Sequence, residues 1–369
     1  MRKIIFLGYF ITLLLFTLFS YLFIDPNFIY LKPLYTGFFI IHRQFVSLIY
    51  TFFIVIFFLF YLIFLKLISK NMLSKKELIL LIGSSGVILL FSYPAMLSYD
   101  IFNYIATAKV AFFYHENPYL IMPIQFIHDP VLLFMHSANT TDPYGPLWIL
   151  ITGAPFLLGF NKFLLILFNF KLLMLAAYLL ACFLVYKLSN NSLKVLMLFA
   201  LNPLVLVETL VSGHNDIVMM TLVLGSLYLV KDRAKSLLLY FLSISVKLST
   251  LFLLPLYVYI FIKKIDIKKI FLYSAILMTV VFFLSPLRKE LYPWYAVWFL
   301  PFLILYSTKK EIILFITLFP FALLLTYLPF MYLGQYSNIT LFTKTALIIL
   351  PLIFWVLYVM LNKVVNKLK

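Results

Sequence analysis

The chain has 369 residues, of which 65% are hydrophobic, 20% aromatic and only 11% charged, whereas soluble domains are roughly 45–50% apolar. The formal net charge is +17, but no basic stretch is interleaved with polar turn residues, which argues against a nucleic-acid surface. Composition therefore excludes an ordinary soluble domain and predicts a membrane protein. Cys182 is the one cysteine, so an intramolecular disulfide is excluded as well.

The apolar residues come in blocks, each long enough to cross the roughly 30 Å of a bilayer core as a helix of about 20 residues. The first block, residues 4–24, is longer than the apolar part of a secretory signal, so we expect it to be the first spanning helix. Residues 52–65 are apolar throughout rather than alternating, which is typical of helices and not of barrel strands. The pattern predicts an all-α, polytopic integral membrane protein with one transmembrane domain over residues 1–369 and roughly 10–12 membrane helices.

The positive charges suggest an orientation for these helices. Short basic clusters flank the apolar runs, and the excess of Lys and Arg in such loops marks the cytoplasmic side; they lie at residues 2–3, 66–76, 187–194, 231–235, 263–269, 309–310 and 363–369. We therefore expect an integral protein of the plasma membrane with both termini in the cytoplasm. The external connections are then residues 25–43, 98–145, 212–216, 287–294 and 331–340.

Two regions do not divide into full spans. Residues 147–160 and 163–186 form two apolar blocks where this orientation requires an odd number of crossings, so we expect one of them not to cross fully. Residues 236–262 begin and end inside but are too few for two spans of about 20 residues. They predict a broken hairpin with Lys247 near its tip.

The external segment 98–146 holds four of the 12 acidic residues, Asp100, Glu116, Asp129 and Asp142. Asp100 follows directly on a spanning run, and in a helix it would share one face with Asn103 and Tyr104. Partial desolvation at the membrane interface raises the pKa of a carboxylate toward the range of a general base. Asp100 is therefore the candidate catalytic base.

The rest of this segment and a second polar turn supply candidate ligand-binding residues. Five Xaa-Pro steps predict a stiff, folded loop at residues 117–146. Residues 212–216 form a polar turn after an acidic residue near a helix end, Glu208, and Gly213 lets the chain reverse. Further metal ligands at defined spacing are missing here. Hydrogen bonding to a polyhydroxylated or phosphorylated ligand is the favoured reading.

Several cations break the rule that positive charges lie inside: Lys109, Lys247, Arg288 and Lys289. Such charges are costly at membrane depth, so we expect them to bind an anion, with Lys247 and Arg288 the best candidates. The alternatives are contact with lipid headgroups, or pairing of Lys247 with Glu208 and of Arg288 with Glu290.

From residue 98 to residue 301 the motifs resemble those of polyprenol-phosphate-mannose-dependent mannosyltransferases of the GT-C type. Those that occur in the same order are Tyr99-Asp100 with Tyr104, Asn117-Pro118-Tyr119, Asp129-Pro130, Tyr144-Gly145-Pro146-Leu147-Trp148, Asn202-Pro203-Leu204 with Glu208, Gly213-His214-Asn215-Asp216 and Pro293-Trp294-Tyr295. The tandem aspartates of several GT-C groups are absent, with Asn103 the nearest polar neighbour of Asp100. Metal dependence stays open, and no cofactor is predicted.

The resemblance implies a membrane enzyme that moves a sugar, mannose in the related enzymes, from a polyprenyl-phosphate donor to an acceptor hydroxyl on the non-cytoplasmic face. Asp100 would be the base, the transfer would invert the anomeric centre, and segment 98–146 would be the catalytic loop. The expected partners are this donor, a glycan or glycolipid acceptor and membrane lipids. The candidate substrate-binding residues are Asn103, Tyr104, Lys109, Asn117, Tyr119, Asp129, Asp142, Tyr144, Glu208, His214, Asn215, Asp216, Lys247, Arg288, Trp294 and Tyr295.

A transporter or lipid flippase is the rival reading, because broken helices and charges within the membrane occur in transporters too. A transporter tends to have inverted repeats and a site at the midplane of the membrane, whereas the polar residues here gather in one external loop.

Overall fold

A computed structural model describes residues 2–32, 37–263, 266–287 and 290–368. All regular elements in these ranges are helices, and no strand occurs among them, so the all-α prediction is confirmed. Within the described residues, six helices are long and apolar enough to cross a membrane. These are α1 (Arg2–Ser20) extended by η1 (Tyr21–Phe23), α3 (Arg43–Ser69), α7 (Phe163–Leu188), α13 (Ile267–Leu284) extended by η7 (Ser285–Leu287), α15 (Lys310–Leu325) continued by α16 (Leu328–Leu333), and α17 (Asn338–Leu368).

Two further segments form a bent pair of helices, which is either a seventh, broken span or a re-entrant loop. Helix α8 (Leu193–Ala200) is followed by α9 (Pro203–Leu206) and the π-helical turn η5 (Val207–Val211), with a bend of 54° between the two parts. Asn202 causes the break, because its side chain accepts a hydrogen bond from the backbone N–H of Leu204 and donates one to the carbonyl of Ile316. Pro203 then begins the next helix, where its missing N–H costs nothing.

The remaining apolar segments form shorter helices, so the predicted count of roughly 10–12 included elements too short to span a bilayer by themselves. They are α4 (Lys75–Leu90), α6 (Pro146–Leu157), α10 (Asp216–Tyr228), α11 (Arg233–Val246), α12 (Leu254–Ile262) and α14 (Leu300–Tyr306). The connections contain α2 (Phe38–Ile41), η2 (Pro94–Met96), α5 (Asp100–Phe112), η3 (Pro123–Gln125), η4 (Pro130–Leu133), η6 (Leu248–Leu253) and η8 (Pro293–Trp298).

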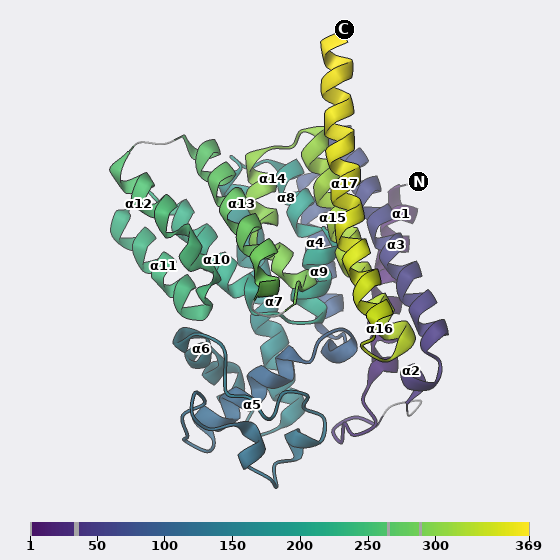
Figure 1. Ribbon diagram of the computed structural model, residues 1–369, viewed down its shortest axis with the longest axis vertical. Helices are drawn as coiled ribbons and strands as arrows, with labels where there is room; N and C mark the ends of the chain where they lie inside the picture. The colour runs from purple at the N-terminus through teal and green to yellow at the C-terminus, as the bar shows by residue number, and fades with distance from the viewer. Residues whose placement is uncertain (1, 33–36, 264–265, 288–289, 369) are drawn as a thin grey trace.

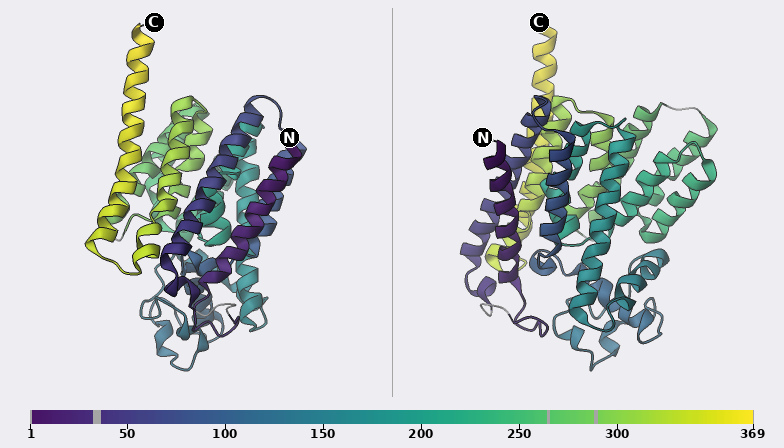
Figure 2. Two further views of the ribbon diagram at one scale, coloured as in Figure 1. Left: turned by 90° about the vertical axis from the view of Figure 1, so that its right-hand side faces the viewer. Right: turned by 180° about the vertical axis from the view of Figure 1, so that it is seen from behind.

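The long helices run side by side, and both termini lie at the same end of the bundle (Figures 1 and 2). The opposite end carries α5, α6 and the loops between them, with α2 and α16 close by (Figure 1). Segment 98–146 thus folds as a cap on one end of the helix bundle.

Both irregular regions take the predicted form. Helix α6 has 12 residues, too few to cross, whereas the following α7 has 26. The second region is a hairpin broken at Lys247, where α11 ends in extended backbone with φ of −158° before the short helix η6. The side chain of Lys247 therefore projects from extended backbone rather than from a helix.

A buried lysine that the sequence analysis did not single out fixes the end of the bent helix pair of α8 and α9. Lys171 on α7 donates hydrogen bonds to the hydroxyl of Ser92, to the carbonyl of Val211 at 2.9 Å and to that of Leu210. Carbonyls at the C-terminal end of a helix lack partners within the helix, and the N–H groups of Lys171 satisfy two of them. Lys171 thereby holds the segment that leads into residues 212–216.

Candidate active site

A cavity of about 1280 Å³ opens where segment 98–146 meets the helix bundle. Asp100, Asn103 and Asp142 contribute polar groups to its lining, and Lys247 contributes a cation. Apolar side chains come from the ends of α11 and α13 and from η6, and aromatic ones come from η8 and the residue before it. These side chains include Ile244, Leu248, Phe252, Val281, Leu284, Tyr292, Trp294, Tyr295 and Trp298.

Asp100 stands in the first turn of α5, with a quarter of its side chain exposed. One carboxylate oxygen, Oδ2, accepts a hydrogen bond of 3.4 Å from the Tyr144 hydroxyl and lies 3.2 Å from Nδ1 of His214. Asn103 lines the cavity on the same face of α5, as expected. Tyr104 does not share that exposure: it is fully buried, and its hydroxyl accepts a hydrogen bond from the backbone N–H of Asn215.

His214 connects Asp100 to a second carboxylate. Its ring is 2% exposed, and Nε2 lies 3.4 Å from Glu208, which is fully buried. Both contacts are ion pairs rather than well-aligned hydrogen bonds. Burial lowers the pKa of His214, but the two carboxylates outweigh it and raise the pKa to about 9. His214 is therefore an imidazolium at neutral pH.

The turn that holds His214 is buried, whereas an exposed loop was expected. Ser212, Asn215 and Asp216 are at most 1% exposed, and neither His214 nor Glu208 is among the residues that line the cavity. Helix η8 covers the turn, with the Trp294 ring stacked on the His214 ring at a centroid distance of 3.9 Å. His214 and Glu208 therefore lie behind the wall of the cavity rather than on its surface.

Lys247 pairs with Asp216 and not with Glu208, the partner considered from the sequence. Its ammonium lies 2.7 Å from Oδ1 of Asp216, which also accepts a hydrogen bond from the indole of Trp298. The pairing follows from the packing of α10 against α11, which brings the first turn of α10 beside the broken end of α11. Aromatic rings surround the ammonium, with the Tyr295 centroid at 4.8 Å.

Gly145 explains how Tyr144 reaches both charged groups. Its N–H donates to the carbonyl of Val246 at 3.0 Å, and a Cβ atom at this position would collide with the backbone carbonyl of Ser245. The start of α6 thus lies directly against the end of α11. As a result the Tyr144 ring is 6.0 Å from the Lys247 ammonium, while its hydroxyl contacts Asp100.

Asp142 is a second carboxylate in the cavity wall. It accepts hydrogen bonds from the Thr107 hydroxyl at 2.9 Å and from the backbone N–H of Tyr144 at 3.2 Å. Burial raises its pKa to about 6, against the lowering effect of these two donors. Asp142 therefore changes charge just below neutral pH.

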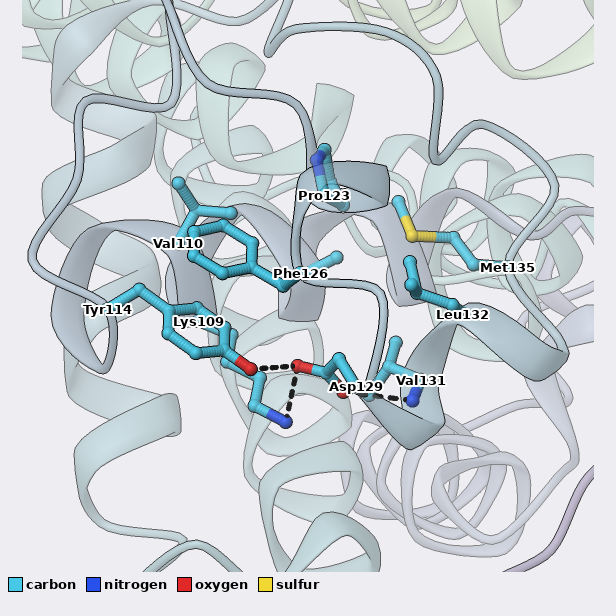
Figure 3. A pocket seen from close by; sticks show the side chains of 10 residues that line it. Lys109, Val110, Tyr114, Pro123, Phe126, Asp129, Val131, Leu132 and Met135 are labelled. Atoms are coloured by element: carbon cyan, nitrogen blue, oxygen red, sulfur yellow. Dashed lines mark hydrogen bonds and ion pairs between the residues drawn. The ribbon is translucent and has the colours of Figure 1, made fainter.

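Other predicted residues lie elsewhere. Lys109 and the Tyr114 hydroxyl both contact one oxygen of Asp129, at 2.7 and 2.8 Å, beside a small pocket of its own (Figure 3). The positive charge of Lys109 is thus neutralised within the loop, and neither Lys109 nor Asp129 lines the main cavity. Asn117 caps a turn by accepting from the N–H of Tyr119, and Tyr119 itself lines the cavity. Arg288 and Lys289 lie outside the described residues.

Sequence reasoning missed several polar residues of the lining. Lys344 and Glu290 form an ion pair at 2.5 Å, and the Tyr327 hydroxyl donates to Glu208 at 3.0 Å. Arg43, Asp25 and His136 also line the cavity. Asp25 could have been found from the sequence, because it directly follows the apolar run of residues 4–24.

Within the described part of the chain, no group of three or more His, Cys, Asp or Glu side chains is arranged to hold a metal ion.

Comparison with known families decides the class. The model of the MptA_B family, alpha-(1->6)-mannopyranosyltransferase, N-terminal domain, matches residues 31–263, which is more than half of the chain. The chain belongs to this family. No curated protein and no solved structure matches it. The match supports a membrane mannosyltransferase, as the motifs predicted, and disfavours the transporter reading. The region matched in this mannosyltransferase includes Asp100, Glu208, His214 and Lys247 and ends before Trp294.

Proposed function

We propose that this mannosyltransferase takes mannose from a polyprenyl-phosphate donor and transfers it, with inversion, to an acceptor hydroxyl, with Asp100 as the general base. One observation carries the proposal: a carboxylate, Asp100, and a cation, Lys247, line the same cavity on either side of Tyr144. A direct displacement needs such a pair, a base for the nucleophile and a positive charge for the departing phosphate.

The step balances with these two residues. The acceptor O–H bond breaks as its proton passes to the Asp100 carboxylate, and the oxygen forms a bond to the anomeric carbon. The bond from that carbon to the phosphate oxygen breaks on the opposite face, and the electron pair leaves with the phosphate. Lys247 stabilises this charge. Displacement from the opposite face inverts the anomeric centre.

The lining suits a lipid-linked sugar. Apolar side chains of η6 and of the ends of α11 and α13 line one part of the cavity, and those of η6 are well exposed; Leu248 is 62% and Phe252 51% exposed. A prenyl chain lying along them would remain in contact with membrane lipids. Trp294 is stacked between the rings of His214 and Tyr292, so Tyr292 and Tyr295 are the aromatic side chains of this stretch that remain to contact the sugar. The hydroxyl-rich loop around Thr140 suits a glycan or glycolipid acceptor.

The proposal includes the orientation derived from the basic clusters. Both termini then lie in the cytoplasm, and segment 98–146, at the opposite end of the bundle, is the catalytic loop on the non-cytoplasmic face of the plasma membrane (Figure 1). In this arrangement, the one transmembrane domain carries the whole site.

The test is substitution of Asp100 by Asn. The amide has nearly the same shape as the carboxylate, but it is not a base and cannot take the proton from the acceptor hydroxyl. Transfer from radiolabelled polyprenyl-phosphate-mannose should fall by a factor on the order of 10² or more, with donor affinity preserved. The control is Glu116→Gln, which replaces an exposed carboxylate of the same loop and should keep wild-type activity. Near-normal turnover of Asp100→Asn in folded protein would refute the role of Asp100.

A further inference from the structure

The imidazolium of His214 lies between two carboxylates beside the cavity, those of Asp100 and Glu208. Nδ1 of His214 faces Asp100 and Nε2 faces Glu208, at 3.2 and 3.4 Å. Of the three groups only Asp100 lines the cavity, since His214 and Glu208 are enclosed in the protein. At neutral pH two negative charges thus share one positive charge. A buried carboxylate placed behind a catalytic base needs an explanation, because it is costly to hold there.

We propose that His214 and Glu208 are positioning residues that set the basicity of Asp100, with Glu208 drawing on the imidazolium so that it does not hold Asp100 too firmly in its charged form. The inference rests on the proposed function, in which Asp100 removes the proton from the acceptor. It assigns to Glu208 and His214 a role in that step without contact with donor or acceptor.

The argument follows the charges through the reaction. If the imidazolium faced Asp100 alone, the pair would stabilise the carboxylate and make it a weak base. It would also leave a buried, unpaired cation once Asp100 had taken the proton, which is unfavourable. With Glu208 present, the imidazolium keeps a partner before and after the transfer. Protonation of Asp100 then changes the group from a net charge of −1 to neutral.

The surroundings hold the three groups in this arrangement. The backbone N–H of His214 donates to the carbonyl of Glu208, and the Trp294 ring covers the imidazole on the cavity side. The Tyr327 hydroxyl donates to both oxygens of Glu208, at 3.0 and 3.2 Å. The raised pKa of His214, about 9, is consistent with an imidazolium throughout the neutral range.

One further carboxylate, Asp142, lies in the same cavity wall, and its pKa of about 6 falls on the acidic limb, so all variants are compared in an Asp142→Asn background. The titratable groups that the structure describes around the three residues themselves are phenols and one ion pair: Tyr50, Tyr104, Tyr144, Tyr292, Tyr327 and the pair of Asp216 with Lys247. An ordinary phenol titrates at about pH 10. The acidic limb of a pH–rate profile therefore lies well below the range in which these phenols ionise.

The experiment compares the pH dependence of kcat/KM for the wild type with that of two variants of the full-length protein. Glu208→Gln leaves the whole imidazolium to Asp100, so the acidic limb should move to lower pH, with a slower plateau. His214→Gln removes the cation, so the limb should move to higher pH. Each shift should be on the order of one pH unit, the usual effect of one nearby charge. Shifts of the acidic limb in opposite directions in the two variants would identify an electrostatic role for His214 and Glu208. Partial loss of structure would lower the rate but would not shift the two limbs in opposite directions.

Tyr178→Phe is the matched control, since it removes another buried hydroxyl bond, to the carbonyl of Ala200, away from the site. Its limb should coincide with that of the wild type. If Glu208→Gln does not fold, Tyr327→Phe tests the same idea: Glu208 loses a donor, binds the imidazolium more strongly, and the limb should rise.

Limbs that stay in place, or move in the same direction in Glu208→Gln and His214→Gln, would overturn the inference. Failure of the proposed function looks different, because Asp100→Asn would then remain active. An inactive Asp100→Asn together with unmoved limbs would refute the role of Glu208 and His214 alone.

Discussion

The ammonium of Lys247 and the carboxylate of Asp216 lie 2.7 Å apart, joining the break in the α11–α12 hairpin to the first turn of α10. Asp216 is 1% exposed, whereas Lys247 lines the cavity. Removal of one partner from a buried pair costs about 3–5 kcal/mol, because the other charge is left uncompensated. Loss of Lys247 alone would therefore affect folding as well as any contact with the donor.

A double substitution separates the two roles. Lys247→Met should lower both stability and donor affinity, and adding Asp216→Asn should restore most of the stability because the buried charge is gone. Donor affinity should stay at least about tenfold weaker in the double variant, in line with the loss of one charged hydrogen bond. The measurements are thermal unfolding in detergent and the Kd of polyprenyl-phosphate-mannose. Wild-type donor affinity in a folded double variant would place the phosphate elsewhere.

Gly145→Ala should disrupt the site without changing a charged group. The added methyl group would meet the backbone of Ser245, so α6 must move away from α11 and separate Tyr144 from Lys247. Because small displacements of positioned groups have large effects on rate, we expect transfer to fall on the order of tenfold or more. The control is Gly83→Ala in α4, where a Cβ has open space and helix propensity favours Ala. Equal activities of the two variants would contradict the role assigned to Gly145.

Asp142→Asn should stabilise the protein in a pH-dependent way. Burial raises the pKa of Asp142 from 3.8 to about 6, so in this window the folded state binds more protons than the unfolded state. The wild type thus loses stability as pH rises through the window, whereas Asn does not titrate. The free energy of unfolding of the variant, relative to that of the wild type, should rise up to about pH 6 and then level off, at a gain of no more than roughly 3 kcal/mol. Unfolding measured between pH 4 and 8 checks this, and a constant difference would speak against it.

Cysteine labelling tests the proposed orientation. In a Cys182→Ala background, Thr140→Cys in the cap should react with a membrane-impermeant thiol reagent in intact cells. Asn71→Cys, in the exposed connection between α3 and α4, should react only after permeabilisation. The reverse pattern would invert the topology. Ser212, in the turn expected to be external, is unsuitable because it is fully buried.

The features predicted correctly from the sequence depend on neighbouring residues. The length of an apolar run decides whether a helix can cross a bilayer, so the all-α architecture, the short α6 and the hairpin broken at Lys247 could be predicted. The helix that presents Asp100 and Asn103 on one face was predicted correctly, but Asp100 does not follow directly on a spanning helix: α4 ends at Leu90, and η2 lies between α4 and α5. Ordered motifs sufficed for the family as well. These properties require no knowledge of how distant segments pack.

The partners of the charged side chains could not be predicted, since they come from segments far apart in the chain. Trp298 meets Asp216 across 82 residues, and Tyr327 meets Glu208 across 119. The sequence suggested Glu208 as a partner of Lys247 and an exposed turn at residues 212–216; the structure buries that turn under η8 and assigns Asp216 to Lys247. Local patterns determine which helices form, but the cost of burying a charge is met by whichever group the packing brings within reach, and only the tertiary structure decides which one that is.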